Sequence, residues 1–171
     1  MRVSQSMEAP SKFAAIPLET QVTVEPGWID YNGHMNVAYY VLAFDRATDR
    51  MLDLLDVGEA YRRRTEASFF VLESHITYDR EVVADDPLRI TTQILGSDTK
   101  RLHFFHHMYH ADAGYLAATT ELMGLHVDLT QRRSAALPAS AAARVAALTA
   151  AHRDLPWPEK AGRRMSLDRK G

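Results

Sequence analysis

The segment 28–36, with the sequence Trp-Ile-Asp-Tyr-Asn-Gly-His-Met-Asn, combines a carboxylate, two amides and an imidazole around one glycine. Gly33 permits a sharp bend of the backbone. An amphipathic segment follows directly, so a helix N-terminus would present free N–H groups to negative charge. An acid or base beside such a helix start is what acyl-transfer chemistry requires. In the structural alternative, Asp30 or Asn32 caps the helix and the other residues only form a turn.

Apolar residues after this segment recur at spacings of three, four and seven, which predicts an amphipathic helix. They are Val37, Tyr40, Val41, Phe44, Met51, Leu52 and Leu55. About 20 residues at 1.5 Å each give a helix on the order of 30 Å long, enough to cross the face of a small sheet.

Extended segments precede and follow this helix. Gln21–Val24 alternates polar and apolar residues and predicts a first strand, which ends before Pro26. Four later segments, rich in β-branched and aromatic residues and separated by turn signals, predict strands, the last three as a meander: Ala67–Asp79, Leu88–Leu95, Leu102–His110 and Tyr115–Asp128. We therefore expect one α+β domain over residues 1–171. Its core covers about 18–137, a loose leader covers 1–15, and a helix at Ala139–His152 precedes a mobile tail from Pro156.

Composition narrows the function classes. The 171 residues carry a net charge of −2, which gives no reason to expect nucleic acid or an anionic membrane as partner. There is no cysteine, so disulfides and thiolate nucleophiles are excluded, and a reducing compartment fits. No apolar run approaches the roughly 20 residues that span a bilayer, and residues 1–12 are polar, unlike a secretory signal. We expect a cytoplasmic protein.

Two features could suggest further sites. Four histidines resemble a metal cluster: His103, His106, His107 and His110. Alternation along a strand, however, puts two of them on each face, and the two histidines that share a face lie about 13 Å apart. A single zinc ion needs ligands at about 2 Å, so we expect no metal site. Glu73 lies in an apolar strand on the face expected for Val71 and His75 and therefore needs a partner or a function. A salt bridge or an exposed face would also explain it, and the same holds for Glu121.

The order of elements, with Asp-x-x-Gly opening the helix, resembles the hotdog-fold acyl-CoA thioesterases of the 4-hydroxybenzoyl-CoA thioesterase-like superfamily over about residues 18–137. Asp30 falls where one branch of that family carries its catalytic carboxylate. Together with Asn32 and His34 it also matches the Asp-x-Asn-x-His pattern of plant acyl-carrier-protein thioesterases. Segments 71–76 and 128–133 are similar to strand endings of bacterial members. More narrowly, the string 28–36 is similar to betainyl-CoA thioesterases of carnitine catabolism, which occur alone or fused to a carnitine dehydrogenase.

The resemblance implies a long central helix wrapped by an antiparallel sheet, and a homodimer, or a dimer of dimers, with sites at the interface between paired sheet edges. It also implies hydrolysis of an acyl-CoA thioester to a free acid and CoA, with no separate cofactor. Asp30 would act as general base on water or as a nucleophile that forms a transient anhydride. Asn32 and His34 would position water or stabilise charge, and backbone N–H groups at Gly33 and Met35 would hold the oxyanion.

The substrate itself implies further residues. CoA phosphates call for cations, and the candidates are Lys100, Arg101, Arg132 and Arg133, which solvated turns would explain equally well. A quaternary ammonium acyl group calls for aromatic rings. The rings expected are Trp28, Tyr31, Tyr39 and Phe70, with Glu73 as counter-charge and Asn36 beside them.

Two other functions remain open at this stage. Hotdog enoyl-CoA hydratases resemble Asp-x-Asn-Pro-x-His, with histidine five residues after aspartate. Here Gly33 replaces the proline and His34 follows Asp30 by four residues, which counts against hydration. The chain could also bind acyl-CoA without hydrolysing it, as a regulatory module.

Overall fold

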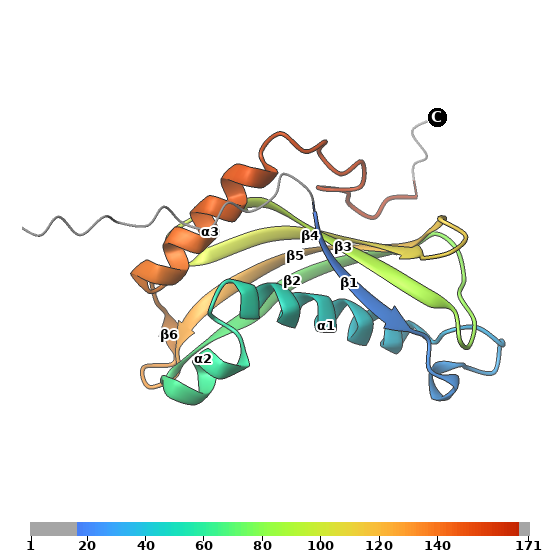
Figure 1. Cartoon of the computed structure of the whole chain (residues 1–171), viewed down its shortest axis with the longest axis horizontal. Helices are drawn as coiled ribbons and strands as arrows, with labels where there is room; N and C mark the ends of the chain where they lie inside the picture. The colour runs from blue at the N-terminus through green and yellow to red at the C-terminus, as the bar shows by residue number, and fades with distance from the viewer. Residues whose placement is uncertain (1–16, 168–171) are drawn as a thin grey trace, which may run out of the picture.

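An antiparallel sheet curls around one long helix in the computed structural model, which describes residues 17–167 (Figure 1). The helix is α1 (Val37–Leu54). The strands lie in the order β1 (Leu18–Thr23), β3 (Pro87–Ser97), β4 (Arg101–His110), β5 (Leu116–Asp128) and β2 (Ala67–Tyr78), and the short β6 (Arg133–Ser134) pairs with the end of β5. The predicted α+β hotdog arrangement is confirmed. Within the described residues no helix is long and apolar enough to cross a membrane.

Asn36 determines where α1 begins. Its side-chain oxygen accepts the Ala38 N–H at 3.0 Å, so Asn36 is the N-cap, and the alternative that Asp30 or Asn32 caps the helix is wrong. The buried face runs along Tyr40, Ala43, Phe44, Ala47, Thr48, Met51 and Leu52. Val37 and Val41, predicted on the same stripe, are 59% and 49% exposed, because this chain covers the first two turns incompletely.

β2 forms an open edge of the sheet, since only β5 pairs with it among the described strands. The register shifts between Val71, opposite Gly124, and Glu73, opposite Met123. Successive residues of β5 point to opposite faces. Val71 and Glu73 therefore lie on different faces, contrary to the sequence prediction, whereas Glu73 and His75 share one.

The four histidines of β4 alternate between the two faces as predicted. His106 is fully buried beneath α1, with Nε2 3.0 Å from Thr48 Oγ1 and Nδ1 2.8 Å from Thr92 Oγ1. Burial lowers the pKa of His106 to about 3, so the ring is neutral and serves as a core hydrogen-bonding group. His103 lies on the other face, with Nε2 2.7 Å from Glu121 Oε1. No group of three metal-ligating side chains occurs within residues 17–167.

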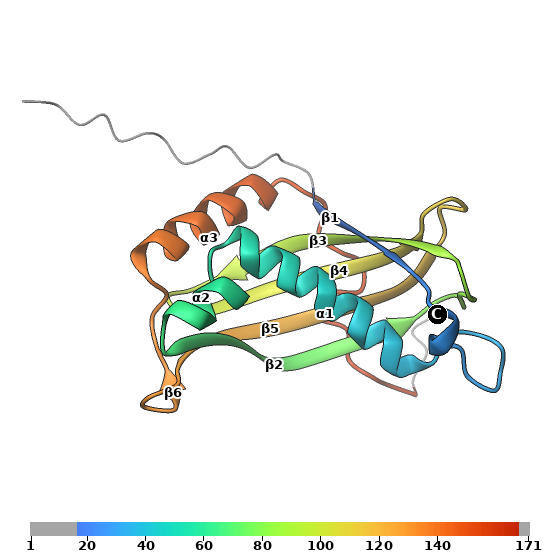
Figure 2. The same cartoon turned by 60° about the horizontal axis from the view of Figure 1, so that its bottom comes forward.

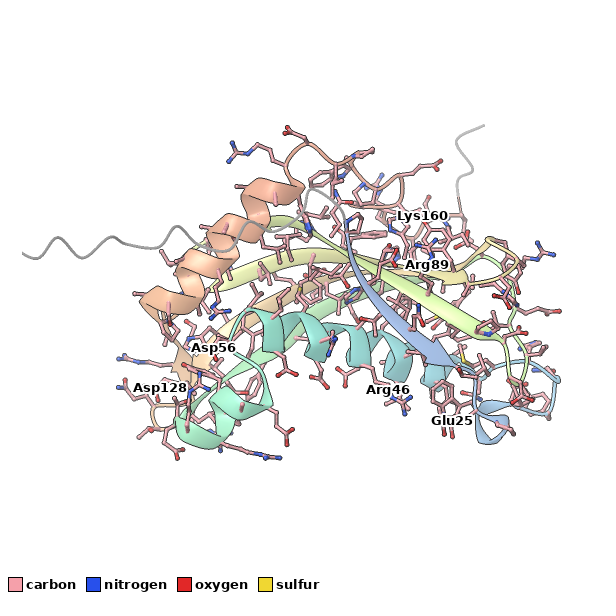
Figure 3. The ribbon with its side chains drawn as sticks, in the orientation of Figure 1. Glu25, Arg46, Asp56, Arg89, Asp128 and Lys160 are labelled. Atoms are coloured by element: carbon pink, nitrogen blue, oxygen red, sulfur yellow. The ribbon has the colours of Figure 1, made fainter. Side chains whose placement is uncertain are left out.

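The C-terminal part of the chain packs against the sheet. After α3 (Ala139–His152), the segment 155–163 crosses the face away from α1, where Figure 3 shows Lys160. Lys160 pairs with Asp79, and the Gly162 N–H donates to Glu121 Oε2 at 2.6 Å. The prediction of a mobile tail from Pro156 is therefore wrong for this segment, because polar strand residues hold it. The predicted leader, residues 1–15, lies outside the described residues.

Two short helices were not predicted. The η1 turn (Pro26–Trp28) precedes the polar loop, and α2 (Glu59–Arg64) follows α1. The arginine run 62–64 belongs to α2, where Arg63 pairs with Glu59 at 2.5 Å and Arg64 with Asp56 at 2.6 Å. It is a solvated, locally paired charge run.

Candidate active site

The polar segment closes into a short loop at the N-terminus of α1, at one end of the sheet (Figure 2). Ile29 and Met35 form an isolated antiparallel bridge. The Asp30 N–H donates to His34 O at 3.1 Å, and the Gly33 N–H donates to Asp30 O at 3.0 Å. Gly33 has φ of +85°, a left-handed conformation that favours glycine, which explains this residue at the bend.

Asp30 holds this loop through one of its two carboxylate oxygens. Oδ1 accepts the Asn32 N–H at 2.8 Å, an Asx turn, and the side chain is half-buried. Within residues 17–167 the other oxygen, Oδ2, accepts no hydrogen bond. One oxygen therefore fixes the carboxylate while the other is available to a water molecule or an acyl group.

The predicted oxyanion donors do not fit this geometry. The Met35 N–H donates to Val82 O at 2.9 Å, and the Gly33 N–H is already bonded to Asp30. A donor that is already paired contributes little to a developing oxyanion. Between them, the His34 N–H has no acceptor among the described residues. The N–H groups of Gly33 and Met35 are therefore engaged within the chain, whereas the His34 N–H is available.

A cleft of about 320 Å³ opens between this loop, the start of α1 and the end of β2. Its lining residues are His34, Met35, Val37, Tyr40 and the run Tyr78–Glu81. The rings of Tyr40 and Tyr78 lie 5.1 Å apart at 81°. Burial raises the pKa of Tyr40 to about 12 and also raises that of Tyr78, so both phenols are neutral near pH 7.

Residues 24–145 match the model of the thioesterase-like superfamily. The chain belongs to this superfamily. It is 41% identical to a betainyl-CoA thioesterase of Pseudomonas aeruginosa over 86% of this chain and 92% of that protein. It is also 38% identical to an L-carnitine dehydrogenase/betainyl-CoA thioesterase of Rhizobium sp, of which it covers only 29%.

Solved structures agree with this family. A hypothetical protein of Staphylococcus aureus in complex with CoA has a TM-score of 0.83 and 30% identity, over 90% of this chain and 98% of that one. A putative thioesterase of Pseudomonas putida KT2440 has a TM-score of 0.77 and 34% identity over the same shares. The sequence prediction of an acyl-CoA thioesterase is confirmed.

Two of the aromatic residues predicted around the thioesterase loop, Trp28 and Tyr39, contact each other. Trp28 is only 4% exposed, and its ring stacks on Tyr39 with centroids 5.4 Å apart. The guanidinium of Arg46 lies 5.0 Å from the Trp28 ring centre and pairs with Glu25 at 3.3 Å, both labelled in Figure 3. Tyr31 is 97% exposed at the loop tip. Trp28 and Tyr39 therefore support the loop, and Asn36 caps α1.

Phe70 and Glu73 lie away from the loop in a single chain. Phe70 is eight residues before Tyr78 along β2, a separation of roughly 26 Å. Glu73 lines a different cavity of about 330 Å³, on the sheet face opposite α1, together with His75, His103 and Glu121. The fold therefore does not place Glu73 beside the loop of its own chain.

The predicted CoA-binding cations gather at the far end of the sheet. Lys100 Nζ donates to Ser134 Oγ at 3.0 Å, which joins the β3–β4 turn to β6. In the sheet register, Arg133 of β6 lies opposite Asp128 of β5, and Asp128 lies opposite Ala67 at the start of β2. Tyr78 lies eleven positions after Ala67, a distance on the order of 35 Å along the strand. Figure 2 shows β6 and the polar loop at opposite ends.

The cationic cluster is partly neutralised. Arg101 Nε pairs with Asp98 at 2.7 Å, and a hydrogen bond from the Lys100 N–H, with others from Arg101, lowers the pKa of Asp98 to about 2. Arg132 has φ of +52° in the turn before β6. In one chain, the structure brings together Lys100 and Arg133 but separates all four cations from Asp30.

Sequence reasoning missed Tyr40 as a cleft residue, and it missed Tyr78 and Glu81 altogether. Tyr40 was placed on the apolar face of the helix and named as a ring that could desolvate Asp30, and Tyr78 closes a strand 38 positions later in the chain. A usable signal was present, however. An aromatic residue followed by three charged residues, Asp79–Glu81, marks a strand end at a polar surface.

Proposed function

We propose that this thioesterase hydrolyses betainyl-CoA, with water as the second reactant, to betaine and CoA. The observation that carries the proposal is its 41% identity to a betainyl-CoA thioesterase, over nearly the whole length of that relative. Fusion proteins that include betainyl-CoA thioesterase in their names match over a similar stretch of the chain. The proposal needs no cofactor besides the substrate and water, and it treats residues 1–171 as one domain.

Asp30 is the proposed chemical centre. As general base, its free Oδ2 would take a proton from the water that attacks the thioester carbon. As nucleophile, it would attack that carbon itself and form an anhydride that water then opens. In both cases the C–S bond breaks: in the first, the proton taken from water passes to the leaving sulfur, and in the second, CoA leaves as the thiolate and takes a proton from solvent. The His34 N–H would donate to the oxyanion, and the side chains of His34 and Asn32 would position the reactants.

A homodimer would complete this site. Phe70, Val71 and Leu72 are 49%, 45% and 58% exposed on the open edge of β2, where an unpaired strand invites a second strand. Antiparallel pairing of two β2 edges about these residues would bring the Tyr78 end of one strand to the end of the partner strand where β2 begins. The partner's Arg133 end would then lie near the polar loop, which one chain alone cannot achieve.

The first test compares acyl groups. Purified protein is incubated with betainyl-CoA, benzoyl-CoA, short aliphatic acyl-CoAs and an enoyl-CoA, and free thiol is followed over time. We expect thiol release, with the highest kcat/KM for betainyl-CoA. Enoyl loss without thiol release would indicate a hydratase, and tight binding with no reaction would indicate a regulatory module. Thiol release without preference for betainyl-CoA would overturn the substrate assignment alone.

The second test concerns the CoA phosphates. Replacement of Lys100, Arg101, Arg132 and Arg133 together by Ala should raise KM about 10-fold with little change in kcat, since charge-assisted contacts to phosphate are lost. Arg62→Ala and Arg63→Ala together remove two cations from α2 and serve as the control. An unchanged KM in the fourfold variant would contradict the CoA role.

A further inference from the structure

The cleft beside the catalytic loop has the chemical character of a cation site. Tyr40 and Tyr78 meet edge to face at 81°, so the two rings stand perpendicular to each other in a corner of the cleft. Tyr40 is almost fully buried, whereas half of Tyr78 is exposed and presents its ring to the cleft. Aromatic faces carry negative electrostatic potential and attract cations that give up water easily, above all quaternary ammonium groups.

Glu81 supplies the negative charge of this corner. Asp79 is paired with Lys160, and the guanidinium of Arg80, which keeps its charge, is held over the Tyr115 ring at 4.2 Å. Glu81 is exposed and has no ion pair within residues 17–167. The Tyr115 hydroxyl donates to the backbone oxygen of Glu81 at 3.1 Å and fixes this segment.

Glu81 also acts on Tyr40. Burial is the main cause that raises the pKa of Tyr40, and the charge of Glu81 raises it as the smallest of the causes. The carboxylate therefore contributes negative potential inside the cleft. The two neutral phenols and one unpaired carboxylate favour a cationic occupant over an anionic one.

The position of the corner suits a betainyl group. One methylene joins the quaternary nitrogen to the thioester carbon, which puts these two atoms about 2.5 Å apart. A subsite for the cation must therefore adjoin the catalytic loop directly. His34 and Met35 belong both to that loop and to the cleft lining, so the cleft meets this requirement.

We propose that Tyr40, Tyr78 and Glu81 form the subsite that receives the trimethylammonium group of the acyl chain, an inference that rests on the proposed function. It differs from the cage predicted from Trp28, Tyr31, Tyr39 and Phe70, of which Trp28 and Tyr39 are stacked on one another. Tyr78 offers the accessible ring, Tyr40 the second wall, and Glu81 the counter-charge.

The decisive experiment uses two substrates of equal shape. 3,3-Dimethylbutanoyl-CoA replaces the quaternary nitrogen of betainyl-CoA with carbon and removes only the charge. We measure the ratio of kcat/KM for betainyl-CoA to that for the neutral compound. Tyr78→Leu should lower this ratio about 10-fold, whereas Tyr78→Phe, which keeps the ring, should hold it within about twofold. Glu81→Gln should lower it about fivefold at low salt and less at high salt.

Controls separate the two levels of the proposal. Tyr109→Leu removes a tyrosine from the opposite face of the sheet and should leave the ratio unchanged. If the unmodified enzyme prefers betainyl-CoA but Tyr78→Leu and Glu81→Gln keep its ratio, the subsite alone is overturned. If the unmodified enzyme hydrolyses the neutral compound and not betainyl-CoA, the proposed function fails instead. Loss of folding in Tyr78→Leu leaves Tyr78→Phe and Glu81→Gln to decide.

Discussion

Asp30→Asn should reduce thiol release from acyl-CoA by a factor of about 10² to 10⁴, the range that a general acid–base or nucleophilic group contributes. The substitution is matched in shape. Asparagine keeps an oxygen at Oδ1 that can accept the Asn32 N–H, so the Asx turn and the loop should persist. It replaces the free carboxylate oxygen with an amide NH2 group. The side chain can then neither take a proton from water nor attack the thioester.

The control for this variant is Asp45→Asn, which neutralises an exposed carboxylate on α1. Thermal midpoints and elution volumes of both variants should equal those of the unmodified protein, so a loss of activity reports chemistry. Full activity in Asp30→Asn would exclude Asp30 from the reaction. A single turnover in ¹⁸O-labelled water separates the two mechanisms, because only an anhydride route can leave label in the peptide that contains Asp30.

Local pattern was sufficient for the elements that hold the site. The spacing of apolar residues predicted α1 within a few residues of its ends, and Gly33 was correctly placed at a bend with positive φ. The alternative cap at Asp30 or Asn32 arose because these residues and Asn36 are all good caps by type. In the structure, the bridge between Ile29 and Met35 closes the loop that contains Asp30 and Asn32, so the helix begins after Met35 and Asn36 is its cap.

Contacts between residues far apart in the chain determine the features that the sequence did not predict. The cleft exists because β2 crosses to the far edge beside β5, which brings Tyr78 to Tyr40. The shift between Val71 and Glu73 moved Glu73 to the outer face, and a bulge of one residue leaves no local sequence signal. The segment after α3 seemed polar and unstructured because its partners, Glu121 and Asp79, lie far away in the chain.

Leu72→Lys should convert the protein to monomers and lower kcat/KM on the order of 100-fold or more, because the proposed site draws on both chains of the proposed dimer. Leu72 is the most exposed apolar residue of the open β2 edge, at 58%. In a symmetric pair of β2 strands, one substitution places two like charges near each other at the centre of the interface. The catalytic loop would remain intact, but the partner's cations would no longer reach it.

Sedimentation velocity and kcat/KM measured on the same samples decide between the alternatives. Leu54→Lys makes the same chemical change at a partly exposed residue at the end of α1 and should affect neither quantity. A Leu72→Lys dimer with full activity would show that β2 is not the interface. A monomer with full activity would show that one chain holds a complete site, and the separation of Asp30 from Lys100 and Arg133 would then argue against a phosphate role for those cations.

A fall from tetramer to dimer with activity intact would place β2 in the outer interface of a dimer of dimers. Only the joint loss of dimer and activity fits a site built from the loop of one chain and the far sheet end of its partner.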